Sequence, residues 1–349
     1  MKVRSITAAV LSILMLNLSG FAYGPNGRDT KKRPVDPLVA MLPASDGVAV
    51  LNARRFFSDA VPQVFSANQP LLSSITSQID NIEAKTGIDL RKFDSVVIGI
   101  ALKKVSEKEY DFDPVAIARG ELRSGALLAI AKLASNGTYR EEKYGEKTIY
   151  IFTAKDVLQK SAAKTSGSKI EETITKALDG LTRDVAVTAV DGNTLAFGSL
   201  TRVREALDGK THVTADITSL LGQKETSVVD FALKTPTGMS KLLPLDNDEL
   251  GANIDSIRFV SGSIDVASAG TSLQVTAKTV KGDQAQGLYE TLDGLKLLGK
   301  AFFGGSKRPD QKVYARLIDN AKISIHGNSV TIDLLVPQSD IDALIGAVK

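Results

Sequence analysis

Histidine, the most versatile acid–base and metal-binding side chain, occurs only twice in the 349 residues of this chain. His212 lies in the connector Thr211–Ala215, and His326 lies in the segment His326-Gly327-Asn328, which is typical of a turn. Neither has a second histidine at the spacing of a zinc site, and the chain has no cysteine to supply a thiolate. We therefore expect no metal site, no cofactor and no catalytic histidine.

Serine motifs of hydrolytic enzymes occur only in incomplete form. In Gly238–Leu242, Leu242 stands where the Gly-x-Ser-x-Gly turn of serine hydrolases needs its closing glycine. Ser161-Ala162-Ala163-Lys164 and Lys85-Thr86-Gly87 match two motifs of penicillin-binding enzymes, but in the reverse order along the chain and without a Ser-Asp-Asn motif. These matches predict no serine nucleophile, and Gly87 is better interpreted as the end of a helix.

Carboxylates are the remaining candidates for chemistry. Asp246–Gly251 begins like a calcium-binding loop, but Leu250 occupies a position that needs an oxygen ligand, and Ile257 replaces the bidentate glutamate. This excludes an EF-hand and leaves a loose surface calcium site as an alternative. Asp111 and Asp113 raise the same question with a less favourable spacing. A hydrolase with paired carboxylates stays open as well, because such a pair can come from distant segments.

The overall composition is that of a chain that buries a core and does not bind nucleic acid. Its 43 basic and 40 acidic side chains nearly cancel, and 43% of its residues are hydrophobic. A near-neutral chain lacks the basic surface that recognises nucleic acid. Because there is no cysteine, the fold depends on apolar burial, which we expect to be divided between two domains.

The N-terminus has the three parts of a secretory signal peptide. Met1–Arg4 carries two positive charges, and Ile6–Leu18 is a mostly apolar run that is shorter than the roughly 20 residues of a membrane-spanning helix. Ser19-Gly20-Phe21-Ala22 then supplies small residues before a cleavage site between Ala22 and Tyr23. The pattern predicts a cleaved signal peptide over residues 1–22, with retention as an anchor as the alternative.

We expect a flexible leader over residues 23–40, because this segment is rich in glycine, proline and charge and has no hydrophobic periodicity. No later segment approaches the length of a membrane span. The mature chain is therefore expected in the periplasm or outside the cell, without a membrane span.

Hydrophobic periodicity predicts a first module over residues 41–210. Four apolar residues from Leu72 to Ile82 have the spacing of one helix face, with Gly87 just beyond its end. A charged loop, Lys103–Asp113, is expected between two strands. The other predicted elements are strands at Val48–Leu51, Ser95–Leu102 and Val115–Leu122, an apolar helix at Gly125–Ala134, hairpins at Thr138–Phe152 and Val185–Gly198, and a final helix with Val203, Ala206 and Leu207 facing inward.

A second module over residues 211–349 repeats this order. Asp255-Ser256-Ile257 matches Asp94-Ser95-Val96 at the start of a strand, and His326-Gly327-Asn328 matches the turn Asp191-Gly192-Asn193. The second copy is shorter by about the length of one hairpin and part of a linker. Because hairpins dominate the connections, we predict an α+β fold of two related modules, with mainly antiparallel sheets packed against helices. Its elements are strands at Ser227–Lys234 and Ser272–Thr279, a long helix at Gln284–Phe303, a hairpin at Lys322–Leu334 and a final helix around Ile341.

The long helix Gln284–Phe303 has an unusual composition. Its leucines and Phe302 recur at the spacing of one face, which is expected to be buried. Its three internal glycines lower its helicity by about 1 kcal/mol each relative to alanine, so we expect them to lie close to a sheet. The apolar face is Leu288, Leu292, Leu295, Leu298 and Phe302, and the glycines are Gly287, Gly294 and Gly299.

Three segments, Leu42–Asn52, Thr86–Ile100 and Asp191–Gly209, carry a family resemblance. They resemble uncharacterised bacterial exported proteins of the domain-of-unknown-function type, which open with a Leu-Pro-Ala segment after the signal and repeat an α+β unit. The resemblance spans most of residues 42–349 and rests on packing and turn residues. It implies export and internal duplication, and it brings no catalytic motif.

The sequence favours a non-enzymatic protein that binds a partner or acts structurally in the cell envelope, because no set of catalytic residues accompanies the packing pattern. One alternative is a carrier of an apolar ligand such as a lipid, enclosed by Gly125–Ala134 and Gln284–Phe303. The other alternative is the carboxylate-based hydrolase. The expected partner is thus an unknown protein or an apolar ligand.

Overall fold

The computed structural model describes residues 34–347 except 107–108, 122–125, 127–128, 130–138, 154–183, 223, 243–247 and 306–308. The predicted signal peptide with its cleavage site at Ala22 and Tyr23 therefore lies outside the described residues. The same holds for nearly all of the apolar segment Gly125–Ala134 and for the motif Ser161–Lys164.

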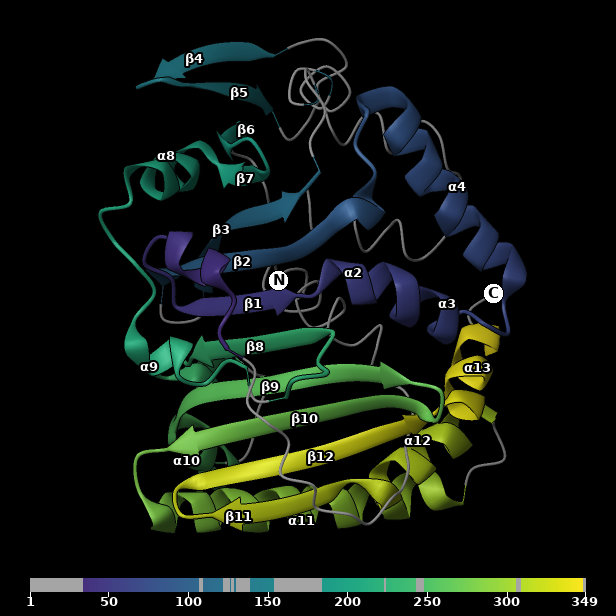
Figure 1. Cartoon of the computed structure of the whole chain (residues 1–349). Coiled ribbons are helices and arrows are strands. Elements are labelled where there is room, and N and C mark those ends of the chain that lie inside the picture. The colour runs from purple at the N-terminus through teal and green to yellow at the C-terminus, as the bar shows by residue number, and fades with distance from the viewer. Residues whose placement is uncertain are drawn as a thin grey trace.

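Twelve strands form one continuous antiparallel sheet with helices packed against it, so the fold is α+β (Figure 1). The order across the sheet is β11-β12-β10-β9-β8-β1-β2-β3-β7-β6-β5-β4. The strands are β1 (Gly47–Leu51), β2 (Phe93–Ser106), β3 (Glu109–Gly120), β4 (Arg140–Tyr144), β5 (Lys147–Thr153), β6 (Asp184–Asp191), β7 (Thr194–Ser199), β8 (Val229–Lys234), β9 (Ile257–Ala267), β10 (Gly270–Thr279), β11 (Lys322–His326) and β12 (Ser329–Pro337).

The two halves of the sheet meet where β1 pairs with β8. In this antiparallel seam Val48 lies opposite Ala232, and Val50 lies opposite Asp230. Outward from the seam, the strands run β1-β2-β3-β7-β6 on one side and β8-β9-β10-β12-β11 on the other. The first half continues with the β4–β5 hairpin beyond β6. The expected antiparallel strands are thus joined in a single sheet that runs through both halves of the chain.

The β2–β3 hairpin is longer than the sequence predicts. The segment Lys103–Asp113 was expected as a charged loop, but its described parts, Lys103–Ser106 and Glu109–Asp113, continue both strands, with Lys103 opposite Asp111. An ion pair at 2.9 Å joins the Lys103 ammonium to the carboxylate of Asp113, which is 2% exposed. Opposite charges on neighbouring strands stabilise the pairing, so a charged segment need not form a loop.

In the first half of the chain, capping residues set the ends of the two longer helices. In α4 (Gln69–Thr86) the Asn68 side chain accepts the Leu71 backbone N–H, and Gly87 ends the helix with φ 73°. In α8 (Leu200–Asp208) the Ser199 hydroxyl accepts the Arg202 N–H at 3.3 Å. Both predicted helices are confirmed, and both ends follow from ordinary capping.

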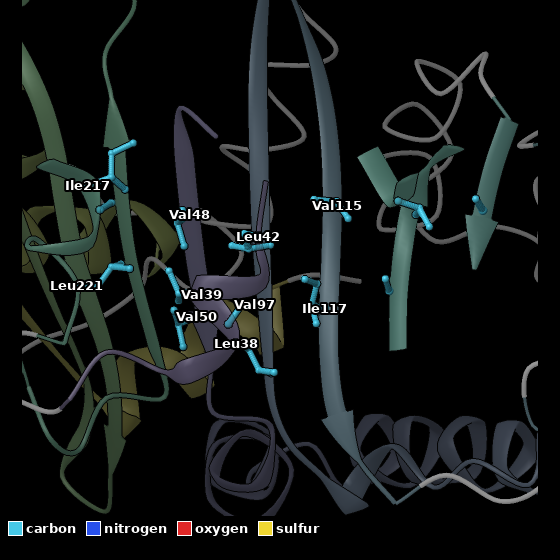
Figure 2. Packing of buried hydrophobic residues seen from close by; sticks show 14 of the residues in the cluster. Leu38, Val39, Leu42, Val48, Val50, Val97, Val115, Ile117, Ile217 and Leu221 are labelled. Carbon is cyan, nitrogen blue, oxygen red and sulfur yellow. The ribbon is translucent and has the colours of Figure 1, made fainter. Parts of the chain in front are cut away.

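The central core forms where η1 (Pro37–Met41) lies on the sheet. Asp36 caps this short helix, and Leu38 and Val39 are buried although the flexible leader was expected to run through residue 40. Figure 2 shows the side chains of η1 and the flanking Leu42 beside those of Val50 and Val97. Burial of these apolar side chains orders the last part of the predicted leader.

The second half places helices behind its strands (Figure 1). The buried Ala285 and Leu288 of α11 pack with Ile257 and Val330 of the sheet, and Val313 and Leu317 of α12 form a neighbouring cluster. The helices are α10 (Asp248–Asp255), α11 (Gly282–Gly304), α12 (Pro309–Asn320) and α13 (Gln338–Ala347). Shorter elements complete the fold: α2 (Ala53–Arg55), η2 (Phe56–Ala60), α3 (Val61–Val64), η3 (Leu90–Lys92), α9 (Ala215–Thr218) and η4 (Met239–Leu242).

The glycines of α11 approach helices and not the sheet, which corrects the sequence prediction. A Cβ at Gly287 would lie 2.9 Å from the Asn253 side chain of α10, and one at Gly299 would lie 2.9 Å from Ile318 of α12. Gly294 has open space around its Cβ position. Two of these three glycines therefore serve helix–helix packing, and the third has room for a side chain.

Candidate interaction surface

The two histidines lie on different elements and have structural surroundings. His212 is exposed, and its Nδ1 lies 3.0 Å from the Ala40 carbonyl, which links the connector after α8 to η1. His326 ends β11 opposite Ser329. Within the described ranges, no three histidine, cysteine, aspartate or glutamate side chains are grouped closely enough to share a metal ion.

The serine candidate in Gly238–Leu242 has a partner that fixes it structurally. The Ser240 hydroxyl donates to Asp255 at 2.7 Å, and its backbone N–H donates to the same carboxylate at 2.8 Å. This contact ties η4 to the end of α10. In the other motif, the Thr86 hydroxyl donates to the Ile82 carbonyl and accepts the Ile88 N–H, as expected at a helix end. The partner motif Ser161–Lys164 lies outside the described residues.

The carboxylates singled out by sequence lie in regular structure. From Asp248 onward the calcium-like segment belongs to α10, and its residues 246 and 247 lie outside the described part of the chain. Asp111 and Asp113 belong to β3. The structure therefore places these acids in a helix and a strand, where backbone geometry differs from that of a calcium loop.

A small cavity lies at the seam between the halves. It is lined by Val50 of β1, Asp230 of β8, Leu221 and the segment Pro34–Asp36. Its volume, about 10 Å³, is enough for about one water molecule. An acyl chain does not fit in a cavity of this size.

A buried guanidinium joins the start of the folded chain to α8. Arg202 is 4% exposed, and it donates to the Ser45 hydroxyl at 2.8 Å and to Glu205 at 2.6 Å. Ser45 in turn donates to the Pro43 carbonyl, and a Cβ at Gly99 would lie 2.5 Å from the Ser45 oxygen. All three segments that carry the family resemblance therefore meet here, in a packing arrangement.

The second half of α11 exposes a group of large apolar side chains. The exposed fractions are 45% for Leu295, 63% for Leu297, 68% for Leu298 and 78% for Phe302. Tyr314 of α12 is 40% exposed. Its ring packs against that of Phe303 at the end of α11, with the two ring centroids 5.9 Å apart. We call Leu295, Leu297, Leu298, Phe302 and Tyr314 the α11 apolar surface.

Helix geometry brings three of these residues to one face of α11. Leu295, Leu298 and Phe302 are spaced by three and four residues and so project from the same face. In the first half of α11, the Asn253 amide of α10 donates to the Gly287 carbonyl and to the Thr291 hydroxyl at 2.8 Å. Further along the helix, Gly294 has open space around its Cβ position.

The predicted buried face of the long helix is therefore only partly right. Leu288 is buried and Leu292 is half-buried, but Leu295, Leu298 and Phe302 are exposed. A stripe with a seven-residue repeat rotates by about 20° per repeat around a straight helix. In addition, α12 packs on the side of Gly299 and Phe303, so it leaves the stripe uncovered.

Charged side chains flank this surface on the α12 side. Lys300 forms an ion pair with Asp319 at 2.5 Å, and Lys296 donates to the Ala321 carbonyl at 2.5 Å. On α12, Arg316 pairs with the buried Asp340 of α13, and the hydrogen bond to this carboxylate raises the pKa of the guanidinium. The α11–α12 contact thus holds Lys300 in place beside the apolar surface, and α13 holds Arg316.

None of the described helices is both long and apolar enough to cross a membrane.

Comparisons with known proteins show a distant likeness in structure. No protein-family model matches the chain, and no curated protein matches it. A solved structure described as crystal form III of TP0453 has a TM-score of 0.45 at 10% identity and covers 90% of this chain and 99% of that chain. Crystal form IV of TP0453 gives 0.44 at 10% identity, with 89% and 97% covered, and crystal form I gives 0.41 at 11% identity, with 91% and 99% covered.

Proposed function

We propose that this chain is an exported, non-catalytic protein that docks onto a partner through the α11 apolar surface. The observation that carries the proposal is the exposure of four large apolar side chains within eight consecutive residues of one helix. Contiguous apolar surface of this kind marks interaction sites, because leaving it in water costs free energy that a partner removes. The structural partners of Ser240 and His212 support the non-catalytic part of the proposal.

The carrier and hydrolase alternatives have less support. The cavity at the seam has room for about one water molecule, and α11 lies against α10 at Gly287 and against α12 at Gly299. Two of the buried carboxylates, Asp113 and Asp340, each pair with a cation on a neighbouring element. A broad activity screen on the purified protein tests the non-catalytic part, and turnover abolished by one substitution would contradict it.

Docking predicts that an apolar probe binds at the α11 apolar surface. The dye anilinonaphthalene sulfonate is mixed with the folded protein, and its fluorescence is compared with that for Leu298→Asp and Phe302→Ser. Because each change removes an exposed apolar side chain, we expect dye binding to fall severalfold in both variants.

The matched control is Val105→Asp, which changes an apolar residue that is 61% exposed on the β2–β3 hairpin. Dye binding should be unchanged in this variant. Equal dye binding by all four proteins, each folded by circular dichroism, would show that the α11 apolar surface is not the binding site and would contradict the proposal.

The export part of the proposal rests on the N-terminal sequence pattern. Expression of the full chain in a bacterium, followed by mass spectrometry of the protein in the periplasmic fraction or medium, should give a mature chain that begins at Tyr23. A chain that keeps Met1–Ala22 would contradict cleavage and support an anchor.

We also propose that the two halves arose by internal duplication, as the sequence resemblance implies. The matching strand order on either side of the β1–β8 seam supports this, as do the helices α8 and α13 that follow the corresponding strands β7 and β12. In an experimental structure, β1-β2-β3-β7-β6 with α8 should superimpose on β8-β9-β10-β12-β11 with α13. Different handedness of the connections in the two halves would contradict duplication.

A further inference from the structure

We propose that the α11 apolar surface binds peripherally to a phospholipid bilayer that contains anionic lipids. This inference rests on the proposed function and names its partner. Helices with leucine and phenylalanine on one face and lysine beside them lie in the interface of a bilayer, with the apolar face buried about 5–10 Å deep. The second half of α11 has this composition, with Leu295, Leu298 and Phe302 exposed on one face.

Charge complementarity is the first argument for an anionic bilayer. Lys300 and Arg316 pair with Asp319 and Asp340, so among the described residues of this region Lys296 and Lys312 are the basic groups available to an anionic partner. The Lys296 ammonium is hydrogen-bonded to a neutral carbonyl, and Lys312 is exposed on α12. Basic residues beside an apolar face add attraction to anionic headgroups that falls with salt.

The position of the surface in the molecule is the second argument. Figure 1 places α11 and β11 at one end of the molecule, opposite the end that carries β4 and β5. Phe302 is the most exposed of the apolar side chains here, and it lies near the end of α11. A projecting apolar surface at one end can reach a flat bilayer, whereas a peptide partner is usually held in a groove.

The aromatic residues fit the depth profile of a bilayer. Phe302 and Phe303 have ring centroids 5.0 Å apart, and Phe303 contacts Tyr314 of α12. In this arrangement Phe302 enters the apolar region, and the amphipathic Tyr314 lies at the level of the headgroups. Lys296 and Lys312 have long apolar stems, so their charges can stay with the phosphates.

The test is co-sedimentation of the purified protein with vesicles of phosphatidylcholine, with and without phosphatidylglycerol. We expect binding to the anionic vesicles that weakens as salt is raised. Leu298→Asp and Phe302→Ser should each reduce partitioning at least tenfold, because each removes a fully inserted apolar side chain. Lys312→Gln should reduce it about fivefold, the effect of one basic residue near an anionic surface.

Two matched controls separate site-specific from general effects. Val105→Asp adds the same charge on the distant β2–β3 hairpin, and Lys278→Gln removes an exposed positive charge on β10, so both should bind like the wild type. Thermal unfolding checks that Leu298→Asp and Phe302→Ser remain folded.

Three outcomes overturn the inference. One is wild-type protein that stays in the supernatant with anionic vesicles while dye binding at the α11 apolar surface persists. That result would assign the surface to a protein partner, such as a second copy revealed by concentration-dependent dimerisation, and would leave the proposed function intact. A second is wild-type protein that binds neither the dye nor the vesicles, which would contradict the proposed function as well. Equal binding to both kinds of vesicle contradicts the electrostatic part.

Discussion

Arg202 is the clearest case of a single residue that holds distant parts of the chain together. Its guanidinium is removed from water, and the Ser45 hydroxyl accepts one of its N–H groups. Ser45→Ala would leave that buried donor without its acceptor, so we expect a loss of about 1–3 kcal/mol in the free energy of unfolding. Urea denaturation monitored by circular dichroism measures the change.

Ser58→Ala is the matched control, because Ser58 is exposed and its hydroxyl donates to the exposed carboxylate of the next residue, Asp59. We expect this change to alter the free energy of unfolding by less than about 0.5 kcal/mol. An equal effect of both substitutions would show that the Arg202–Ser45 contact adds no stability.

The Asp191 carboxyl group makes the stability of the β6–β7 turn depend on pH. Its carboxylate accepts the backbone N–H of Asn193 at 2.8 Å, and this hydrogen bond lowers the pKa of the carboxyl group. A carboxyl group whose pKa is lower in the folded protein stabilises the fold at pH values above its unfolded pKa of about 3.9. This stabilisation is lost as the pH falls through the pKa of the folded state. Asp191→Ala should therefore cost about 0.5–1.5 kcal/mol at neutral pH, and the cost should shrink in acid.

The control for this prediction is Asp191→Asn, which keeps an oxygen for the Asn193 N–H but does not titrate. Urea unfolding of wild type and both variants between neutral pH and pH about 3 provides the comparison. A cost of Asp191→Ala that stays constant over this range would contradict the role assigned to the carboxylate charge.

At the scale of elements, two glycines of the second half should respond oppositely to alanine. A Cβ at Gly262 of β9 would lie 2.3 Å from the Gln274 carbonyl of β10, a backbone atom that cannot yield. Gly294 of α11 has open space instead. Gly262→Ala should therefore destabilise the protein by about 1–3 kcal/mol, and Gly294→Ala should stabilise it by up to about 1 kcal/mol. Thermal unfolding of the two variants measures both effects, and destabilisation by both would contradict the open position of Gly294.

The elements that could be predicted are those whose signals are local. The start of α4 at Asn68 and Pro70 and its end at Gly87 are set by neighbouring residues, and so is the turn Asp191-Gly192-Asn193 between β6 and β7. The extent of the β2–β3 hairpin could not be predicted, because it depends on the Lys103–Asp113 pair across two strands. The helical structure of η1 could not be predicted either, because it depends on contacts of Leu38 and Val39 with the sheet.

The candidate site, too, could be predicted only as far as local sequence signals reach. Periodicity identifies an apolar stripe on α11 but does not show what covers it, since a buried stripe and an exposed one have the same spacing. The side of α11 on which α12 packs decides the outcome, and this is a tertiary feature. One local signal was available in Leu297, which lies off the stripe, and in the lysines at positions 296 and 300.

At the scale of the whole molecule, the continuous sheet should make the two halves unfold together. The β1–β8 seam pairs five residues on each strand, and the core under η1 includes Ala232 of β8 as well as Val48 of β1. We expect one cooperative thermal transition, to which Ser45→Ala in the first half and Gly262→Ala in the second both contribute. Two separate transitions, each shifted by only one of the substitutions, would contradict this account.

The central claim is that the α11 apolar surface is open in the isolated protein and becomes covered when it docks. Because the chain has no cysteine, Leu298→Cys provides a single site for an environment-sensitive fluorophore, with Val105→Cys as the control. The most direct measurement is the emission of this fluorophore before and after anionic vesicles are added. We expect emission typical of water at both positions in the free protein and a blue shift at position 298 alone on docking. Emission at position 298 that is already blue-shifted in the free protein and does not change would contradict the central claim.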